Sequence, residues 1–200
     1  MADFFFSIDR SIFYFVNHSL QNVLFDALMP ILTDLNKKPI AIVVVLALWA
    51  WLLVKGGKEG QIGAILLVVA VVMSDWVSSV LLKSLFERLR PCHVLPDVHL
   101  LVSCGSGFSF PSSHAVNNFT GAVVLSRYVP KGRWYFFVFA AAEAFSRVYV
   151  GVHYPSDIMA GSGIGLCLGY LTVVLFTRGQ AMWNARTSSR AVPTDKSGDE

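Results

Sequence analysis

The stretch from Ser146 to Asp157, SRVYVGVHYPSD, contains an Arg, a His and an Asp that a single turn could bring together. Five residues separate Arg147 from His153, and three separate His153 from Asp157. The apolar residues suit the end of one buried helix, and the proline before Asp157 suits the start of the next. A His bonded to a carboxylate can act as a nucleophile, an Arg binds phosphate oxygens, and the free N–H groups of a helix start attract phosphate. The stretch therefore predicts phosphoryl chemistry.

Two basic residues earlier in the chain have helical spacing. Lys83 and Arg90 are seven residues apart, or two turns, so both side chains lie near one face of a helix. The helix should end at Arg90, because Pro91 follows and a residue before proline avoids the helical conformation. Such side chains at a membrane boundary often only extend toward water, so this pair alone does not specify an anion site.

A third group lies at a predicted helix start. Pro111 and Ser112 are residues favoured at this position, which places His114 in the first turn. Capping alone would explain the serine. Capping does not explain the histidine, since the positive end of the helix dipole disfavours an imidazolium. A phosphate bound nearby would restore the charged form.

The composition is that of a membrane protein. Hydrophobic residues make up 54% of the 200 residues and charged residues only 14%, whereas soluble domains are about a quarter charged. The net charge of +3, without a basic stripe interleaved with aromatic residues, argues against a nucleic-acid partner. Three cysteines are too few for a disulfide scaffold or a thiolate metal cluster, and the N-terminus lacks the features of a cleaved signal peptide.

The hydropathy pattern predicts an all-α bundle of five or six transmembrane helices. The apolar segments that form firm spans are residues 39–54, 61–82, 111–128, 134–150 and 157–177. Residues 1–36 are too polar for a clean span, so we expect one or two helices that lie in the interface or insert partly, with a tilted first span as the alternative. The transmembrane domain then covers residues 37–178. Residues 179–200 are predicted to be a polar, disordered cytoplasmic tail.

Charges at the ends of the spans give an orientation. The positive-inside tendency makes one side cytoplasmic, namely the side with Lys55, Lys58, Arg127, Lys131, Arg133, Arg178, Arg186 and Arg190. The opposite ends carry Lys83, Arg88, Arg90 and Arg147. An anionic substrate on the outer face would explain these cations. We therefore expect a multi-pass protein of the inner (plasma) membrane with its site facing the periplasm or the outside.

The three groups together resemble the three-part signature of the type 2 phosphatidic acid phosphatase (PAP2) superfamily. The matching residues are Lys83, six residues, Arg90-Pro91; Pro111-Ser112-x-His114; and Ser146-Arg147, five residues, His153, three residues, Asp157. The motifs span residues 83–157, and the flanking helices fit the membrane branch of the family. Ser113 departs from the family pattern, which has Gly there. Its backbone N–H remains available to phosphate, so we expect activity to be kept with a slightly altered pocket.

The resemblance implies a role for each matching residue. His153 would attack phosphorus and form a phosphohistidine, with Asp157 orienting its ring. His114 would protonate the leaving oxygen and then activate water. The phosphate oxygens would be held by Lys83, Arg90, Ser112, Ser113 and Arg147. With this many cationic groups around one anion, no metal and no other cofactor is expected.

The implied function is hydrolysis of a lipid phosphomonoester or diphosphate presented from the bilayer. Undecaprenyl diphosphate, phosphatidylglycerophosphate, phosphatidic acid and lipid A phosphates all fit the family, and the compactness of the chain favours undecaprenyl diphosphate. A phosphotransferase that passes the phosphoryl group to a lipid or sugar hydroxyl would use the same histidine chemistry. A transporter that uses the charges as an ion path is a second alternative, although such a path should place charges at several depths.

Two acids in the predicted spans receive supporting roles. Glu143 lies one turn before Arg147, so it is predicted to pair with that residue and orient it. Asp75 lies two turns before Lys83, and a polar contact within the bundle is expected for it rather than catalysis.

A long polar loop, residues 83–111, carries two of the three cysteines. Cys92 and Cys104 fall on the side that the charges place outside the cytoplasm, where disulfides persist. Eleven residues separate them, so a disulfide is one alternative and two small apolar side chains are the other. Cys167 lies in the fifth span and should be a free thiol. Irregular spacing argues against a metal site formed by the polar residues of this loop: His93, Asp97 and His99.

Overall fold

The computed structural model describes residues 2–190, and within that range the chain forms helices and connecting loops without strands. This confirms the predicted all-α class. The helices are α1 (Ala2–Tyr14), η1 (Phe15–Ser19), α2 (Val23–Thr33), η2 (Leu35–Lys37), α3 (Pro39–Lys55), α4 (Gly57–Trp76), η3 (Val77–Leu82), α5 (Lys83–Phe86), α6 (Pro91–Val94), α7 (Ser113–Tyr128), η4 (Pro130–Gly132), α8 (Arg133–Tyr149) and α9 (Pro155–Arg190).

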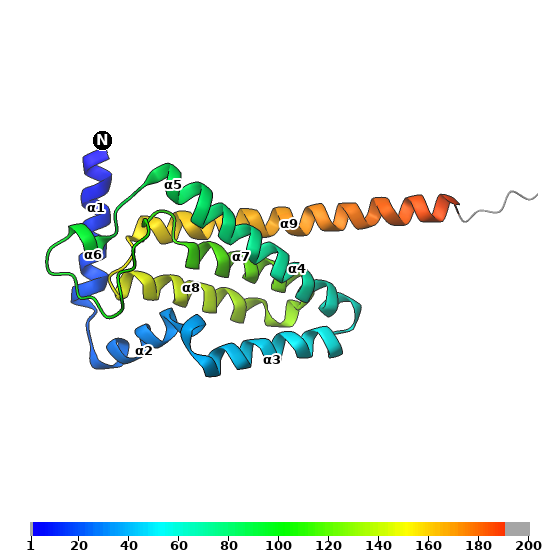
Figure 1. The fold of residues 1–200 in the computed structure, drawn as a ribbon, viewed down its shortest axis with the longest axis horizontal. Coiled ribbons are helices and arrows are strands. Elements are labelled where there is room, and N and C mark those ends of the chain that lie inside the picture. Colours follow the sequence, from blue (N-terminus) through cyan, green and yellow to red (C-terminus); the bar gives the residue numbers. More distant parts are fainter. Residues whose placement is uncertain (1, 191–200) are drawn as a thin grey trace, which may run out of the picture.

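Helix α7 is the centre of the bundle, with α4, α8 and α9 packed around it (Figure 1). Two glycines let α9 approach α7 closely. A Cβ at Gly161 would lie 2.8 Å from the carbonyl oxygen of Ser112, and one at Gly165 would lie 2.4 Å from that of Val116. Both distances are too short for a side chain, so glycine is required where the beginnings of α7 and α9 meet. These two helix starts carry four of the predicted site residues.

The outer surface of the bundle is strongly apolar. Helix α3 buries none of its residues, and Val43, Leu48 and Trp51 are each more than half exposed. The segments Gly57–Val94 and Pro155–Ser188 are long and apolar enough to cross a membrane. Exposed apolar surface of this extent suits lipid contact rather than water.

The N-terminal helices close one end of the bundle. Figure 1 shows α1 running across the ends of the other helices, whereas α2 runs alongside α8. Phe13 and Val16 pack against Tyr149, Val152 and Tyr154 in a buried cluster. The start of α9 is therefore covered by α1. The placement of α1 and α2 in the membrane interface stays a prediction.

Three predicted boundaries differ from the structure. Residues 83–111 are not all loop, because α4, η3 and α5 follow one another without a break to Phe86 and α6 adds one further turn. The predicted end of this helix at Arg90 is wrong: Glu87 has a left-handed backbone (φ 45°), which ends the helix, so Lys83 and Arg90 do not share one helix.

Helix α9 continues to Arg190, so residues 179–190 are helical where disorder was the expectation. A helix that the bundle has already nucleated can extend beyond it without the cost of a new nucleus. Residues 191–200 lie outside the described part of the chain.

Candidate active site

A cavity of about 910 Å³ lies where α7 begins and α8 ends. Seven of the nine predicted site residues form its polar wall: Lys83, Arg90, Ser113, His114, Glu143, Arg147 and His153. The other two, Ser112 and Asp157, are fully buried. Side chains from several separate elements therefore face one space.

His153 on this wall is paired with Asp157. Its Nδ1 lies 3.3 Å from Asp157 Oδ2, and both side chains are buried. Because an ionised carboxylate only accepts hydrogen bonds, Nδ1 carries the proton and Nε2 keeps its lone pair. Burial lowers the pKa of His153 to about 4, although Asp157 opposes the shift, so the ring is neutral at pH 7. A neutral imidazole with a free nitrogen is the form that can attack phosphorus.

Asp157 is held by three donors besides His153. Ser109 Oγ donates to its Oδ2, and the backbone N–H of Tyr154 donates to the same oxygen at 2.8 Å. Arg88 Nη1 donates to Oδ1 at 2.6 Å. The Tyr154 bond is that of a capping box, in which an acid in the first turn reaches back to the N-cap N–H. The carboxylate is therefore fixed both by its own helix and by the loop before α7.

The start of α9 is not free to bind phosphate, which corrects the expectation from the sequence. Asp157 accepts the N–H of Tyr154. Asp9 of α1 accepts the N–H of Ser156 at 2.9 Å. The N–H groups of Asp157 and Ile158 both bond to the carbonyl oxygen of Tyr154. Two carboxylates thus occupy the positive end of this helix in place of a phosphate.

The start of α7, in contrast, has backbone N–H groups that are free to bind a phosphate. Its first intrahelical bond runs from Val116 N–H to Ser112 O, so the N–H groups of Ser113 and His114 precede it and lack a partner within the helix. The Ser112 hydroxyl is buried without a partner among the described residues. The Ser113 hydroxyl lies 3.0 Å from that of Ser79, so its side chain has a partner, whereas its N–H has none among residues 2–190. The beginning of α7 is the helix start that can bind phosphate oxygens.

His114 faces a carboxylate across the cavity wall. Its Nε2 lies 3.9 Å from Glu143 Oε1, and Asn118 donates to Glu143 Oε2 at 3.0 Å. The hydrogen-bonded contact of Glu143 is thus with α7, and its predicted pairing with Arg147 one turn further along α8 stays a prediction. The contact places an acid beside the histidine that is predicted to transfer protons.

Three cations complete the wall. Arg147 donates from Nη1 to the Thr33 hydroxyl at 2.7 Å, and its Nε is buried without a partner in the described part of the chain. Arg90 donates from Nε to the carbonyl oxygen of Gly107 at 2.8 Å. Lys83 lines the same cavity. The remaining N–H donors of these three side chains are the groups that can bind an anion there.

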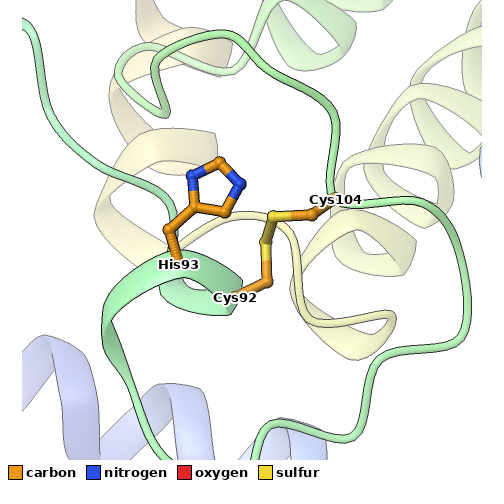
Figure 2. A group of neighbouring side chains, drawn as sticks. All are labelled: Cys92, His93 and Cys104. Carbon is orange, nitrogen blue, oxygen red and sulfur yellow. A yellow bond between two sulfur atoms is a disulfide. The ribbon is translucent and has the colours of Figure 1, made fainter.

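A disulfide closes the loop that brings Arg88 and Ser109 to Asp157. Figure 2 shows Cys92 bonded to Cys104, with 6.1 Å between their Cα atoms, which decides between the two alternatives left open by the sequence in favour of the disulfide. A backbone hydrogen bond from Ser109 N–H to Arg88 O, 2.6 Å long, joins the two ends of the loop. The loop is therefore closed twice, once by a covalent bond and once beside Asp157.

Several potential metal ligands of this loop have other partners. The His93 ring lies beside the disulfide (Figure 2), but the two sulfurs are bonded to each other and are not thiolate ligands. His99 Nε2 lies 3.1 Å from Asp26 of α2, so it points to an acid outside the loop. Cys167 is a free thiol, as predicted.

Four residues that hold the site are not predicted from the sequence as part of it: Asp9, Thr33, Arg88 and Ser109. No local spacing links Asp9 to Ser156 or Thr33 to Arg147, because these contacts arise only when α1 and α2 pack on the bundle. Arg88 is recognisable in the sequence only as one more cation on the outer side. The one signal in the sequence that points to Arg88 as a site residue is its position two residues before Arg90.

Comparison with protein families supports the signature. A model of the PAP2 superfamily matches residues 63–180. The matched segment contains all nine predicted site residues and the elements from α4 to most of α9.

Individual relatives share part of the chain. An undecaprenyl-diphosphatase of Sulfolobus acidocaldarius is 36% identical over 123 residues, which are 61% of this chain and 57% of that protein. A lipid A 4′-phosphatase of Porphyromonas gingivalis is 29% identical over 157 residues, which are 68% and 65% of the two chains. The phosphatidylglycerophosphatase B of Bacillus subtilis is 32% identical over 117 residues, or 53% and 55%. The chain therefore spans about half to two thirds of the length of these relatives.

Solved structures share the fold. LpxE of Aquifex aeolicus superposes with a TM-score of 0.67 and 27% identity, covering 82% of this chain and 93% of that one. A transmembrane PAP2-type phosphatidylglycerolphosphate phosphatase of Bacillus subtilis gives a TM-score of 0.63 over 86% of each chain, and at 23% identity it shows the shared fold alone. The helical bundle, the apolar surface and the matched segment agree, and the chain is a membrane protein that belongs to the PAP2 superfamily.

Proposed function

We propose that the protein is a membrane phosphatase that hydrolyses a phosphomonoester or diphosphate bond of a lipid. The observation that carries this proposal is the single cavity that gathers the neutral His153, three cations, His114 and the open start of α7. Phosphoryl transfer to a side chain needs a nucleophile, a proton donor for the leaving oxygen and positive groups around the other oxygens. The cavity supplies each of these.

His153 begins the reaction. Its Nε2 attacks phosphorus while the bond from phosphorus to the leaving oxygen breaks on the opposite side. Asp157 accepts a hydrogen bond from Nδ1–H and stabilises the positive charge that develops on the ring. His114 gives its proton to the leaving oxygen, which departs as a lipid alcohol or as a lipid monophosphate.

Water then cleaves the phosphohistidine. His114, now neutral, takes a proton from the water as the water oxygen attacks phosphorus. The N–P bond breaks and its electron pair returns to Nε2 of His153, so inorganic phosphate leaves and His114 is again protonated. The side chains of Lys83, Arg90 and Arg147 hold the equatorial oxygens in both steps.

A second cavity supports a lipid as the substrate. It has a volume of about 720 Å³ and is lined mostly by apolar side chains of α3, α4, α7 and α8. The residues that it shares with the polar cavity are Val45, Leu46, Asn117, Asn118 and Phe139. A phosphorylated headgroup would bind among the cations while a hydrocarbon chain would extend along the apolar space. Undecaprenyl diphosphate is the substrate to test first, because the 36% identical relative bears the name undecaprenyl-diphosphatase.

The same proposal includes an orientation. Residues 37–178 form the catalytic membrane domain, the cavity opens on the periplasmic or outer side, and the end of α9 lies in the cytoplasm. The charge distribution at the helix ends supports this arrangement.

The test is phosphate release by the purified full chain in detergent with EDTA present. The panel contains undecaprenyl diphosphate, phosphatidylglycerophosphate, phosphatidic acid and lipid A, and a parallel set adds a lipid alcohol as acceptor. Inorganic phosphate should appear from at least one lipid, and His153→Ala, purified in the same way, should release none above background. Activity that chelation abolishes and Mg²⁺ restores would contradict the mechanism. Transfer to the acceptor without phosphate release would identify a phosphotransferase instead.

A further inference from the structure

Arg88 links two carboxylates that come from opposite ends of the chain. Its Nη1 lies 2.6 Å from Asp157 Oδ1, and its Nη2 lies 2.6 Å from Asp9 Oδ2. The guanidinium also lies over the Tyr154 ring, with 3.9 Å between Cζ and the ring centroid. A planar guanidinium held in this way cannot turn without breaking both ion pairs. The position of Arg88 therefore depends on Asp9 as much as on Asp157.

Asp9 also holds the first turn of α9. Its Oδ1 accepts the N–H of Ser156 at 2.9 Å, and its Oδ2 accepts the Ser156 hydroxyl at 2.5 Å. The side chain is buried, with 7% of the residue exposed. Ser156 is the residue directly before Asp157, so Asp9 fixes the backbone that carries Asp157 and the arginine that binds it.

The two oxygens of Asp157 have separate partners. Oδ1 accepts from Arg88, whereas Oδ2 accepts from His153, Ser109 and the Tyr154 N–H. Arg88 also donates to the Ser156 hydroxyl at 2.7 Å, but Asp9 is its second carboxylate. Without that carboxylate, Arg88 would pair with Asp157 alone and weaken the attraction of Asp157 for Nδ1–H of His153. Sharing the charge of Arg88 with Asp9 keeps Oδ2 available to the histidine.

We propose that Asp9 and Arg88 are positioning residues for the nucleophile: they set the orientation and charge of Asp157, and through it the tautomer and direction of His153. This inference rests on the proposed function, because it takes His153 as the nucleophile. The proposal gives α1 a part in catalysis although α1 contributes no residue to the lining of the cavity, whose first lining residue in the sequence is Leu32.

The variants are chosen to keep the fold. Asp9→Asn preserves the shape of the side chain and removes its charge. Melting temperatures report whether each chain is folded. The matched control is Asp26→Asn, which changes an acid of α2 whose partners are His99 and Tyr149.

The first readout is the kinetics of each variant on a lipid that the wild type hydrolyses. Asp9→Asn should lower kcat by about 10- to 100-fold, the loss typical of groups that orient a functional histidine, with KM unchanged. Asp26→Asn should keep the wild-type kcat. In an Asp157→Asn background, Asp9→Asn should cause no further loss, because its effect passes through Asp157. An equal loss in both backgrounds, or an unchanged kcat in Asp9→Asn, would overturn the proposal.

The second readout does not need turnover. In ¹⁵N-histidine NMR spectra, assigned with His153→Ala, the wild-type ring should carry its proton on Nδ1. Asp9→Asn should give a mixture with the proton on Nε2, and an unchanged tautomer would overturn the positioning role. A wild-type chain that releases phosphate from no lipid of the panel counts against the proposed function, whereas the NMR comparison still decides the role of Asp9.

Discussion

At the scale of single residues, the site combines a histidine that burial makes neutral with a carboxylate that directs it. The two side chains, His153 and Asp157, are almost completely inaccessible to water, yet Asp157 accepts hydrogen bonds from four donors. A buried carboxylate is tolerated only with such partners. The same partners prevent it from turning away from the histidine.

The protonation of His153 can be measured directly. Burial lowers its pKa to about 4, so the ring loses its free lone pair only as the pH falls through about 4, not through the usual value of about 6.5. Histidine NMR titration should therefore find this ring neutral at pH 5.5. Asp157→Asn should move the pKa further down, because it removes the group that raises it. A wild-type midpoint near 6.5, or an upward move in the variant, would contradict this account.

His114 should matter only when the leaving group needs a proton. His114→Ala is expected to lower kcat for a lipid alkyl phosphate by about 100- to 10,000-fold, the usual contribution of general acid catalysis. The rate of phosphoenzyme formation from p-nitrophenyl phosphate should fall far less, since nitrophenolate leaves without protonation. The comparison uses rapid-quench kinetics of the two substrates. Equal losses on both would mean that His114 serves binding or folding rather than proton transfer.

At the scale of elements, the site is built from two helix starts and one closed loop. The start of α7 is left open for phosphate, whereas the start of α9 is occupied by Asp157 and Asp9. Between them, the loop closed by Cys92 and Cys104 delivers Arg88 and Ser109 to Asp157. The loop therefore holds Asp157 in place even though most of it lies away from the cavity.

The disulfide should stabilise the protein and keep this loop in place. Replacing Cys92 and Cys104 together by Ser should lower the free energy of unfolding by roughly 3 kcal/mol, from the entropy of the closed loop. It should also lower kcat, because Arg88 and Ser109 are less firmly held. Mass spectrometry of alkylated, unreduced wild type should find only Cys167 modified. Alkylation of all three cysteines would mean that the bond does not form.

The sequence predicts residues that one segment brings together better than it predicts contacts between different helices. Lys83, His114 and the residues from Arg147 to Asp157 were predictable, because their types and spacing match the three-part signature. Arg90 was predictable from the same signature but not from helical spacing, since the helix that carries Lys83 ends at Phe86. The pairing of Glu143 with His114 and the closing of the α9 start by Asp9 were not predictable. Both are contacts between different helices, and the helical period of one segment does not specify which neighbour it meets.

At the scale of the whole molecule, a polar site at one end of the bundle adjoins an apolar cavity within it. The two cavities share part of their lining, so a headgroup and a hydrocarbon chain could be bound together. Helix α3, which buries none of its residues, forms one wall of the apolar space. A substrate from the bilayer suits this arrangement better than a soluble phosphate ester.

The orientation in the membrane can be tested with single cysteines in a Cys167→Ser chain. Val94→Cys, at an exposed position of α6, should react in intact cells with a thiol reagent that cannot cross membranes. Lys131→Cys, in the turn between α7 and α8, should react only after the cells are opened. The reverse pattern would place the active site in the cytoplasm.

The central claim is that His153 forms a covalent bond to phosphorus, and trapping that intermediate tests it most directly. The full chain is mixed with a ³²P-labelled lipid phosphate, denatured within milliseconds, and the labelled peptide is sequenced. The account predicts label on the peptide that contains His153, lost in acid and stable in alkali, and absent from His153→Ala. Label on a serine or an aspartate, or turnover by His153→Ala at the wild-type rate, would contradict it.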